Sequence, residues 1–593
     1  MDGTKLARRY LPLAVVLALQ ALIITIVPST APGSSNTASG SLYTQNGTGG
    51  VPGSSGATGS SGSLAGAGGT ATGAGAATGS SASGAGGTAG TGGGGAGGAT
   101  PTGTAAGDTS HCVDGRQYDP KIDYYAPPCT PKFTGANGGN TYRGVTKDQI
   151  EVVWYVSDYG PEVNAILQAQ GLYVSFSQAQ AFNNAVEKFV NSHYELYGRK
   201  LHIDTYAGQC QSVPPDKQCL IPEMDTIVAK YHPYAVIWNT TLCSDCFAEL
   251  ARKGTVNLGG AGFSEAFNQA MNPYHWDVNM TGTRMMSMFA NWWCSQMTSN
   301  NSSRVVKYAP NFNPAQNFNG KKRVLGVIST NDPDNQYTAQ KILAPLLKQK
   351  CGEDFSQNQY YYDQNINTAA QQTQAGIAAM NKPGHPATTV LCLCDPVAPQ
   401  FLYSGEAQNN YWPENVLATN QGMDADTVGQ TYTSDGGLAC PQSGHCPYDL
   451  AFGLSQLDAG EPLDNDTATR IWHLGGGQGN TPFESDTATT NWGYINMLMT
   501  MIQATGPDLT PQNMAAAAFR IPPRGGGDTG RILRVLAPDN HGWNADVRIV
   551  YWDKHQKSNV NGKPGHYVQI EGARKNGSFD AIDGPPMPMD GRH

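Results

Sequence analysis

The chain contains 593 residues, and its 46 acidic and 37 Lys or Arg side chains give a formal net charge of -9. This mildly acidic balance offers no dense Lys/Arg face that could neutralise phosphates, which argues against a nucleic-acid partner. Only 14% of the residues are charged, against about 25% in an average soluble protein, and we associate this composition with secreted proteins.

The N-terminus predicts a membrane segment. Three basic residues lie among the first nine positions, and an uncharged run of 17 residues follows them from Leu11 to Val27. As a helix this run spans roughly 26 Å, the short end of a transmembrane span. The preceding basic residues predict a cytoplasmic N-terminus with the remainder outside. Residues 1–30 are therefore expected to be a signal-anchor, with a cleaved signal peptide as the alternative.

Residues 31–107 are almost entirely Gly, Ala, Ser and Thr. Such a stretch cannot bury enough apolar surface to offset the entropy of ordering its backbone, so it is expected to be a disordered linker. As a random coil of about 75 residues, its ends average roughly 50 Å apart. About 480 residues remain for folded structure, enough for two or three lobes.

All 12 cysteines follow the linker. An even number in an exported domain predicts disulfides. The expected short-range pairs are Cys112–Cys129, Cys210–Cys219, Cys243–Cys246 and Cys440–Cys446. Spacing does not reveal how the others pair; these are Cys294, Cys351, Cys392 and Cys394. For the Cys243-Ser-Asp-Cys246 motif, zinc binding and a thioredoxin-like redox role are the alternatives.

Residues 108–141, rich in Tyr, Pro and Gly with two cysteines, are expected to form a disulfide-stapled leader on the body of the protein. Strand and helix patterns then alternate through residues 142–275. Strands are expected at 150–156, 201–206, 235–238 and 255–258, with helices near 182–190, 224–231 and 247–251. Because the connections are short, right-handed crossovers and a parallel sheet follow. This is the first predicted lobe.

Residues 276–484 show the same alternation of strands and helices and form the second predicted lobe. Strands are expected at 324–328, 360–362, 390–394 and 416–419, with helices over 284–297, 342–347 and 369–380. A Gly-rich stretch, 436–485, is interpreted as a long excursion. A helix over 491–504 and a β-ribbon of residues 547–552 and 567–570 are assigned to the first lobe, which thus includes 485–593. The predicted fold class is α/β, with two Rossmann-like lobes of parallel sheet flanked by helices and a cleft between them.

Several segments carry a resemblance to a known family. They are Gly144-Val-Thr-Lys-Asp-Gln-Ile-Glu-Val-Val153, the passage 189–203 with its Gly198-Arg199-Lys200 turn, residues 227–237, and residues 491–513. These resemble the branched-chain amino acid binding proteins of ABC transporters. The resemblance implies the class I periplasmic-binding-protein fold, in which two lobes joined by three crossovers close on a small polar ligand. It also implies a non-enzyme without a cofactor and with a permease as partner.

The resemblance implies ligand contacts in the turns that follow particular strands. In the first lobe these are Ser157, Tyr159, Asn239, Thr240, Thr241, Gly260 and Ala261, and in the second lobe Tyr337, Asp395, Asn420 and Gln421. Hydroxyls and free backbone N–H groups at a helix start suit a carboxylate. Where the family has an acidic residue for the ligand's ammonium, this chain has Asn420-Gln421, with Asp424 nearby. The alternative for each residue is a capping or turn role.

One motif resembles a catalytic site. Gly262-Phe-Ser264-Glu-Ala266 nearly matches a nucleophile elbow, and His275 follows it. A secreted serine hydrolase is therefore one alternative, and the other interpretation is that Ser264 caps the next helix. The turn at Asp332-Pro-Asp334 lacks the Gly and Glu of a calcium loop, and no metal site is proposed.

The function predicted from the sequence is extracytoplasmic solute binding for an ABC-type importer. The ligand would be an amino acid or a related small polar molecule. A surface-tethered sensor or adhesion module on the same fold is the alternative. Either protein would lie at the cell surface or outside the cell.

Overall fold

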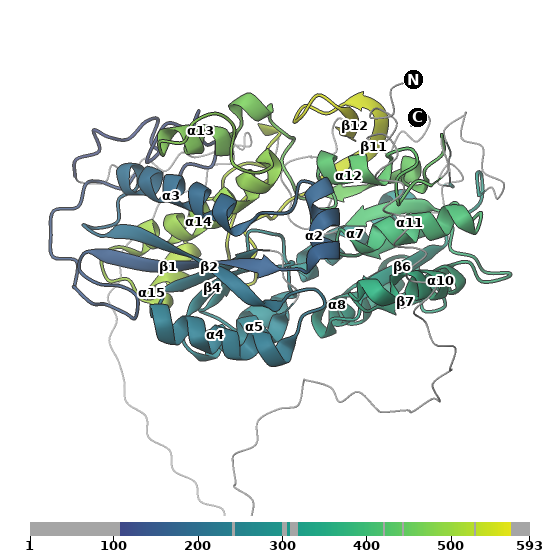
Figure 1. Ribbon diagram of the computed structural model, residues 1–593, viewed down its shortest axis with the longest axis horizontal. Coiled ribbons are helices and arrows are strands. Elements are labelled where there is room, and N and C mark those ends of the chain that lie inside the picture. The colour runs from purple at the N-terminus through teal and green to yellow at the C-terminus, as the bar shows by residue number, and fades with distance from the viewer. Residues whose placement is uncertain are drawn as a thin grey trace, which may run out of the picture. The chain divides into compact units, whose positions relative to one another are not determined.

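A parallel β-sheet and a mainly parallel one, each flanked by helices, form the two lobes of the protein in a computed structural model (Figure 1). The structure describes residues 107–239, 243–298, 305–306, 308, 318–418, 422–441, 444–526 and 529–570. All of them belong to one compact unit, Thr100–His593. The predicted anchor and nearly all of the predicted linker lie outside these residues. Among the described residues, no helix has the length and apolar character needed to cross a membrane.

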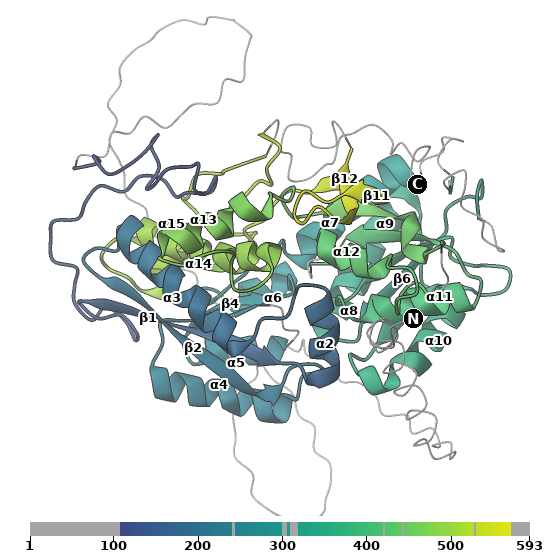
Figure 2. The same cartoon turned by 45° about the horizontal axis from the view of Figure 1, so that its top comes forward.

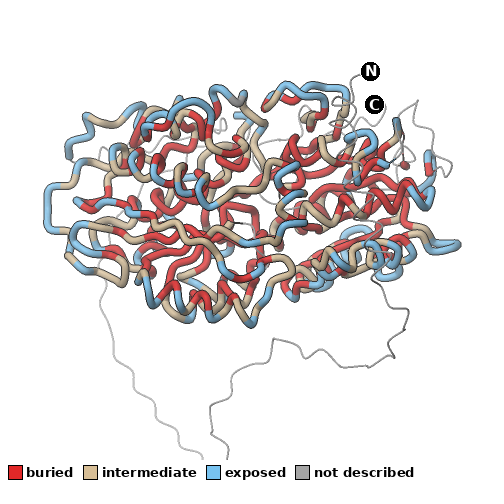
Figure 3. Tube along the Cα trace, in the orientation of Figure 1, coloured by how far each residue is buried: buried red, intermediate tan, exposed pale blue. Residues whose placement is uncertain are grey.

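The first sheet has the order β2-β1-β3-β4-β5 and is parallel throughout. Its strands are β1 (Gln149–Asp158), β2 (Lys200–Gln211), β3 (Ala235–Asn239), β4 (Val256–Gly260) and β5 (His275–Trp276). The strand interiors are near-continuous apolar runs because helices cover both faces. Figure 3 shows these strands as largely buried.

Helices lie on both faces of the first sheet (Figures 1 and 2). One face packs against α3 (Phe176–His193), α13 (Thr467–Leu474), α14 (Ser485–Thr505) and α15 (Pro511–Ala518). The other face packs against α4 (Lys217–Tyr231) and α5 (Ser244–Arg252). The short helices α2 (Pro161–Ala169) and α6 (Glu265–Ala270) follow β1 and β4 at the end of the sheet nearest the second lobe.

The second sheet has the order β12-β11-β10-β9-β8-β6-β7. Its strands are β6 (Leu325–Thr330), β7 (Gln359–Tyr362), β8 (Thr389–Leu393), β9 (Glu414–Ala418), β10 (Ala451–Ser455), β11 (Arg548–Lys557) and β12 (Pro564–Gln569). The first five are parallel, whereas β11 and β12 are antiparallel. The helices are α7 (Gly282–Trp292), α8 (Pro333–Tyr337), α9 (Ala344–Cys351), α10 (Ala369–Met380), α11 (Ala398–Gln408) and α12 (Asp426–Tyr432).

Three crossovers join the lobes, as the resemblance implied. At the first, Val278 packs in the first-lobe core and Met280 in the second. The second lies between β10 and α13. At the third, Trp543 packs in the first-lobe core and Val547 in the second. The predicted fold class is therefore confirmed for the described residues.

Two boundaries of the predicted lobes were wrong. The C-terminal ribbon belongs to the second sheet, because β11 pairs with β10 through partners such as Tyr551 and Phe452. The stretch 436–485 is not one excursion. It contains β10, and it also contains α13, whose Ala468 and Ile471 share the first-lobe core.

Six disulfides join all 12 cysteines. Four are the expected short-range pairs. The two pairings that spacing left open are Cys294–Cys351 and Cys392–Cys394. Cys243–Cys246 lies at the start of α5, and Cys294–Cys351 ties the residues after α7 to the end of α9.

Candidate ligand-binding cleft

The carboxyl ends of β1, β3 and β4 bring several of the expected ligand residues together. These three strands are neighbours, and Asn239 pairs with Gly260. Ser157 accepts a hydrogen bond from Trp238 Nε1 at 2.7 Å. Gly260 has φ +98°, and a Cβ there would lie 2.5 Å from the Phe263 ring, so this turn requires glycine. These residues therefore lie at the edge of the first sheet that faces the second lobe.

Asn239 offers an unsatisfied acceptor at this edge. Its Nδ2 donates to Asn491 Oδ1 at 2.8 Å, whereas its own Oδ1 is buried and has no hydrogen-bond partner among the residues that the structure describes. Ala261 is buried and Tyr159 is partly buried nearby. Four of the expected ligand residues, Thr240, Thr241, Asn420 and Gln421, lie outside the described residues.

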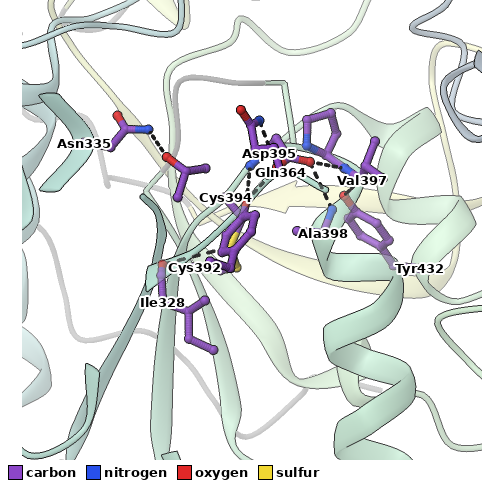
Figure 4. Close-up of a disulfide and its surroundings, with 12 residues drawn as sticks. Ile328, Asn335, Gln364, Cys392, Cys394, Asp395, Val397, Ala398 and Tyr432 are labelled. Carbon is purple, nitrogen blue, oxygen red and sulfur yellow. Dashed lines mark hydrogen bonds between the residues drawn. A yellow bond between two sulfur atoms is a disulfide. The ribbon is translucent and has the colours of Figure 1, made fainter. Parts of the chain in front are cut away.

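Tyr337 and Asp395 lie at the corresponding edge of the second sheet, after β6 and β8. Figure 4 shows that Asp395 is fully engaged within the protein. Its Oδ1 accepts the N–H groups of Val397 and Ala398 at the start of α11, and its Oδ2 accepts Tyr362 and Gln364 at 2.6 and 3.2 Å. Asp395 therefore stabilises the turn that leads into α11, and a turn role was one of the alternatives for each expected ligand residue.

An apolar pocket of about 620 Å³ lies beside Asp395. Val163 and Val213 of the first lobe form part of its wall, and Ile328, Phe401 and Leu402 of the second lobe form another part. Because the polar atoms of Asp395 are already satisfied, this pocket offers contact area with little charge.

Direct hydrogen bonds join the lobes across the cleft. The backbone N–H and the Oγ of Ser264 donate to the two carboxylate oxygens of Asp334 at 2.6 and 2.5 Å. Gln170 Nε2, just after α2, donates to the Pro396 carbonyl at 2.7 Å. Both contacts hold the lobes in the arrangement seen here.

Ser264 is expected to resist labelling by an active-serine reagent such as a fluorophosphonate. Its Oγ is buried, accepts the N–H of Phe267 as the cap of α6, and donates to Asp334. Among the described residues, none of its hydrogen bonds involves a histidine, and His275 bonds to Asn257 instead. Mass spectrometry of the labelled native protein checks this, and modification of Ser264 would revive the hydrolase alternative.

A second, charged cavity lies along the crossovers, with about 1110 Å³ of space open to solvent at its mouth. Residues from all three crossovers line it, including Asn279, Gln456 and Asn544. The first lobe contributes Asp486 and Trp492 to the lining. The second lobe contributes Asp424, Asp426 and Tyr567. Both lobes and the segments between them therefore form the wall of one cavity.

Charges in this cavity are incompletely paired. Asp424 Oδ1 and Arg534 Nε are buried without hydrogen-bond partners among the described residues. Burial and the nearby carboxylates of Asp426, Glu484, Asp466 and Asp424 raise the pKa of Asp486 to about 8. Of these residues the sequence had indicated only Asp424, because the others lie in separate elements without a recognisable spacing.

Two groups of potential metal ligands exist among the described residues, and neither lines this cavity. Asp435, Cys440 and Cys446 lie close together, but the two cysteines form a disulfide. Glu151, His202 and Asp204 lie on β1 and β2, with their donor atoms within 4.8 Å of one another. The Asp332 turn caps α8 by accepting the N–H groups of Asp334 and Asn335.

Comparisons found no matching family model and no matching curated protein. Solved structures are similar to the chain. A possible leucine/isoleucine/valine-binding protein from Rhodopirellula baltica is 13% identical, covers 71% of this chain and 96% of its own, and has a TM-score of 0.44. A solute-binding protein of an ABC transporter from R. palustris, in complex with 4-hydroxybenzoate, is 11% identical. The match covers 73% of this chain and 98% of that protein, with a TM-score of 0.47. A branched-chain amino acid ABC transporter protein from Thermus thermophilus with bound valine is 10% identical. The match covers 71% of this chain and 95% of that protein, with a TM-score of 0.47.

Proposed function

We propose that the protein is an extracytoplasmic solute-binding protein that captures a small polar ligand, an amino acid or a related molecule, between its two lobes. The observation that carries this proposal is the charged cavity, whose walls come from both lobes and all three crossovers. A ligand there touches both lobes at once, so its binding free energy favours one relative arrangement of them. Closure of the two lobes then changes the surface that a membrane partner recognises.

The remaining assignments fit an exported receptor. Six disulfides suit an oxidising compartment outside the cytoplasm. We propose that residues 1–30 tether the protein to the membrane and that the linker lets the binding domain reach an ABC permease. Ser157, Asn239 and Gly260 remain proposed contacts at the edge of the cleft.

Thermal unfolding of the full-length protein against amino acids, amides, short peptides and sugars tests the proposal. A ligand that binds only the native state, present at 100 times its Kd, stabilises it by about 2.7 kcal/mol. We expect Tm to rise with one chemical class. If Tm is unchanged across the whole panel, the proposal fails, and a surface sensor or adhesion module on the same fold becomes the better interpretation.

A pair of matched variants locates the binding site. Thr490→Phe places a ring at the wall of the charged cavity, whereas Ala516→Phe places one at an exposed position of α15. We expect the first variant to abolish the ligand-induced rise in Tm and the second to retain it. If both retain it, the ligand binds elsewhere in the protein.

A further inference from the structure

Asp424 presents an unsatisfied carboxylate oxygen at the charged cavity. The residue is 3% exposed. Its Oδ2 accepts Ser455 Oγ at 2.8 Å and the Gln456 N–H at 3.1 Å. Its Oδ1 is buried and has no hydrogen-bond partner in the part of the chain that the structure describes. An unpaired oxygen of this kind is costly unless a ligand supplies the missing donor.

Asp486 presents a second carboxylate at the same cavity, from the first turn of α14. Among the described residues, no hydrogen bond or ion pair involves its carboxylate oxygens. Three of its neighbours, Asp426, Asp466 and Asp424, are also acidic and line the cavity with it. A cation placed between these groups would relieve their mutual repulsion.

The basic groups that line the cavity do not balance these carboxylates. Arg531 bonds to Glu461, and Arg548 bonds to the carbonyls of Leu457 and Asp458. The charge of Arg548 lowers the pKa of Asp424, but burial is the larger effect and raises it. Arg534 lies over the Tyr125 ring at 3.6 Å. The lining has three guanidinium groups, those of Arg531, Arg534 and Arg548, and seven carboxyl groups, those of Asp123, Asp424, Asp426, Asp458, Glu461, Asp466 and Asp486. Because the pKa of Asp486 is raised to about 8, this group keeps its proton at neutral pH, and the other six carboxyl groups still outnumber the three guanidinium groups.

His566 does not change this balance of charges, because it already pairs with the carboxylate of Asp426. Its Nδ1 lies 2.7 Å from Asp426 Oδ2. The excess of negative groups therefore selects a positively charged ligand, whereas an anion would meet like charge on most of the wall.

The spacing of the carboxylates favours an organic cation over a bare metal ion. Asp424 and Asp486 belong to neither of the described groups whose donor atoms gather within 4.8 Å. An ammonium group on a carbon skeleton can donate to separated oxygens and fill a larger space. Aromatic residues in the lining, Tyr124, Tyr125 and Tyr567, suit the skeleton of such a ligand and its charge.

Resting on the proposed solute-binding function, we propose that the solute is an organic ammonium compound whose charged nitrogen lies between Asp424 and Asp486. This narrows the ligand class to amines, including basic amino acids, and makes the two carboxylates the residues that determine specificity.

Isothermal titration of the full-length protein at low ionic strength tests this with probes matched in size and differing in charge. The probes are butylamine, agmatine and lysine as cations, butanol as the neutral analogue, and valerate as the anion. We expect at least one cation to bind and the neutral and anionic analogues to bind at least tenfold more weakly. Asp486→Asn and Asp424→Asn should each weaken cation binding at least tenfold, whereas Asp464→Asn, at an exposed position outside the cavity lining, should change it less than twofold.

The outcomes separate the two proposals. Binding of neutral or anionic solutes without binding of cations overturns the inference and leaves the solute-binding function standing. Undiminished cation binding by both cavity variants also overturns it, because the nitrogen must then lie elsewhere. If no solute of any charge binds here or in the thermal panel, both proposals fail. Thermal unfolding of each variant without ligand shows whether it is folded.

Discussion

Replacing Arg323 by Met is expected to lower the free energy of unfolding by about 3–5 kcal/mol, the largest loss we expect from a single substitution. Arg323 and Glu414 form a bidentate ion pair at 2.7 and 2.9 Å, with side chains 3% and 0% exposed. Glu414 Oε2 also accepts Thr389 Oγ1 at 2.9 Å. Removing the guanidinium leaves a buried carboxylate without its counter-charge, and nearby water cannot replace it.

The matched control for this substitution is Arg252→Met on α5. Arg252 pairs with Glu249, but its side chain is 66% exposed, so the pair contributes little to stability. Denaturant unfolding of the two variants at neutral pH compares a buried pair with an exposed one. We further expect Arg323→Met/Glu414→Leu to recover much of the lost stability, because the lone charge is then gone. Equal, small losses in both single variants would contradict this account.

The strands of both sheets were predictable where burial on two faces imposes a continuous apolar run. The run from Ile150 to Val156 became β1, and the run from Val390 became β8. Two strands lacked such a run. β5 has only two residues, and β10, Ala451–Ser455, is a five-residue segment with a central glycine inside a Gly-rich stretch. Their existence depends on neighbouring strands that extend the sheet, which local pattern does not show.

The partner of a strand is also a tertiary property. The sequence predicted a C-terminal ribbon, because residues such as Val550 and Tyr567 have strand-like neighbours. It did not predict that the ribbon would extend the second sheet, since pairing of β11 with β10 joins residues about a hundred positions apart. Alternation of side chains identifies a strand but leaves its partner open.

The charged cavity was largely invisible in the sequence for the same reason. Asp424, Asp486 and Arg534 come from three distant segments. Each has ordinary local surroundings, such as the turn after a strand or the first turn of a helix, where acidic residues are common for reasons of helix stability. Only the fold places them around one space. By contrast, the turns after β1, β3 and β4 could be identified from the strand pattern, because parallel strands end at one edge.

Asp486→Asn is expected to stabilise the protein by an amount that increases with pH between about 4 and 8. In the unfolded chain this carboxyl ionises near its ordinary pKa of 3.8, and in the native protein burial and neighbouring carboxylates raise its pKa to about 8. Between these values the unfolded chain gives up a proton that the native protein keeps, so wild-type stability falls as pH rises from about 4 to 8. Asn has the same shape, stays neutral and carries no such penalty.

The gain in stability from Asp486→Asn should therefore be close to zero at pH 4, increase through pH 6, and level off above pH 8 at on the order of 5 kcal/mol. Denaturant unfolding at pH 4, 6 and 8.5 measures it as the difference between variant and wild type. That difference cancels groups common to both proteins, such as Asp277, whose pKa burial raises to about 7. Asp464→Asn is the control, and a gain that does not vary with pH would contradict the burial of Asp486 beside other carboxylates. If an ammonium ligand binds there, it favours the ionised form, so its affinity in the wild type should rise with pH until Asp486 has lost its proton.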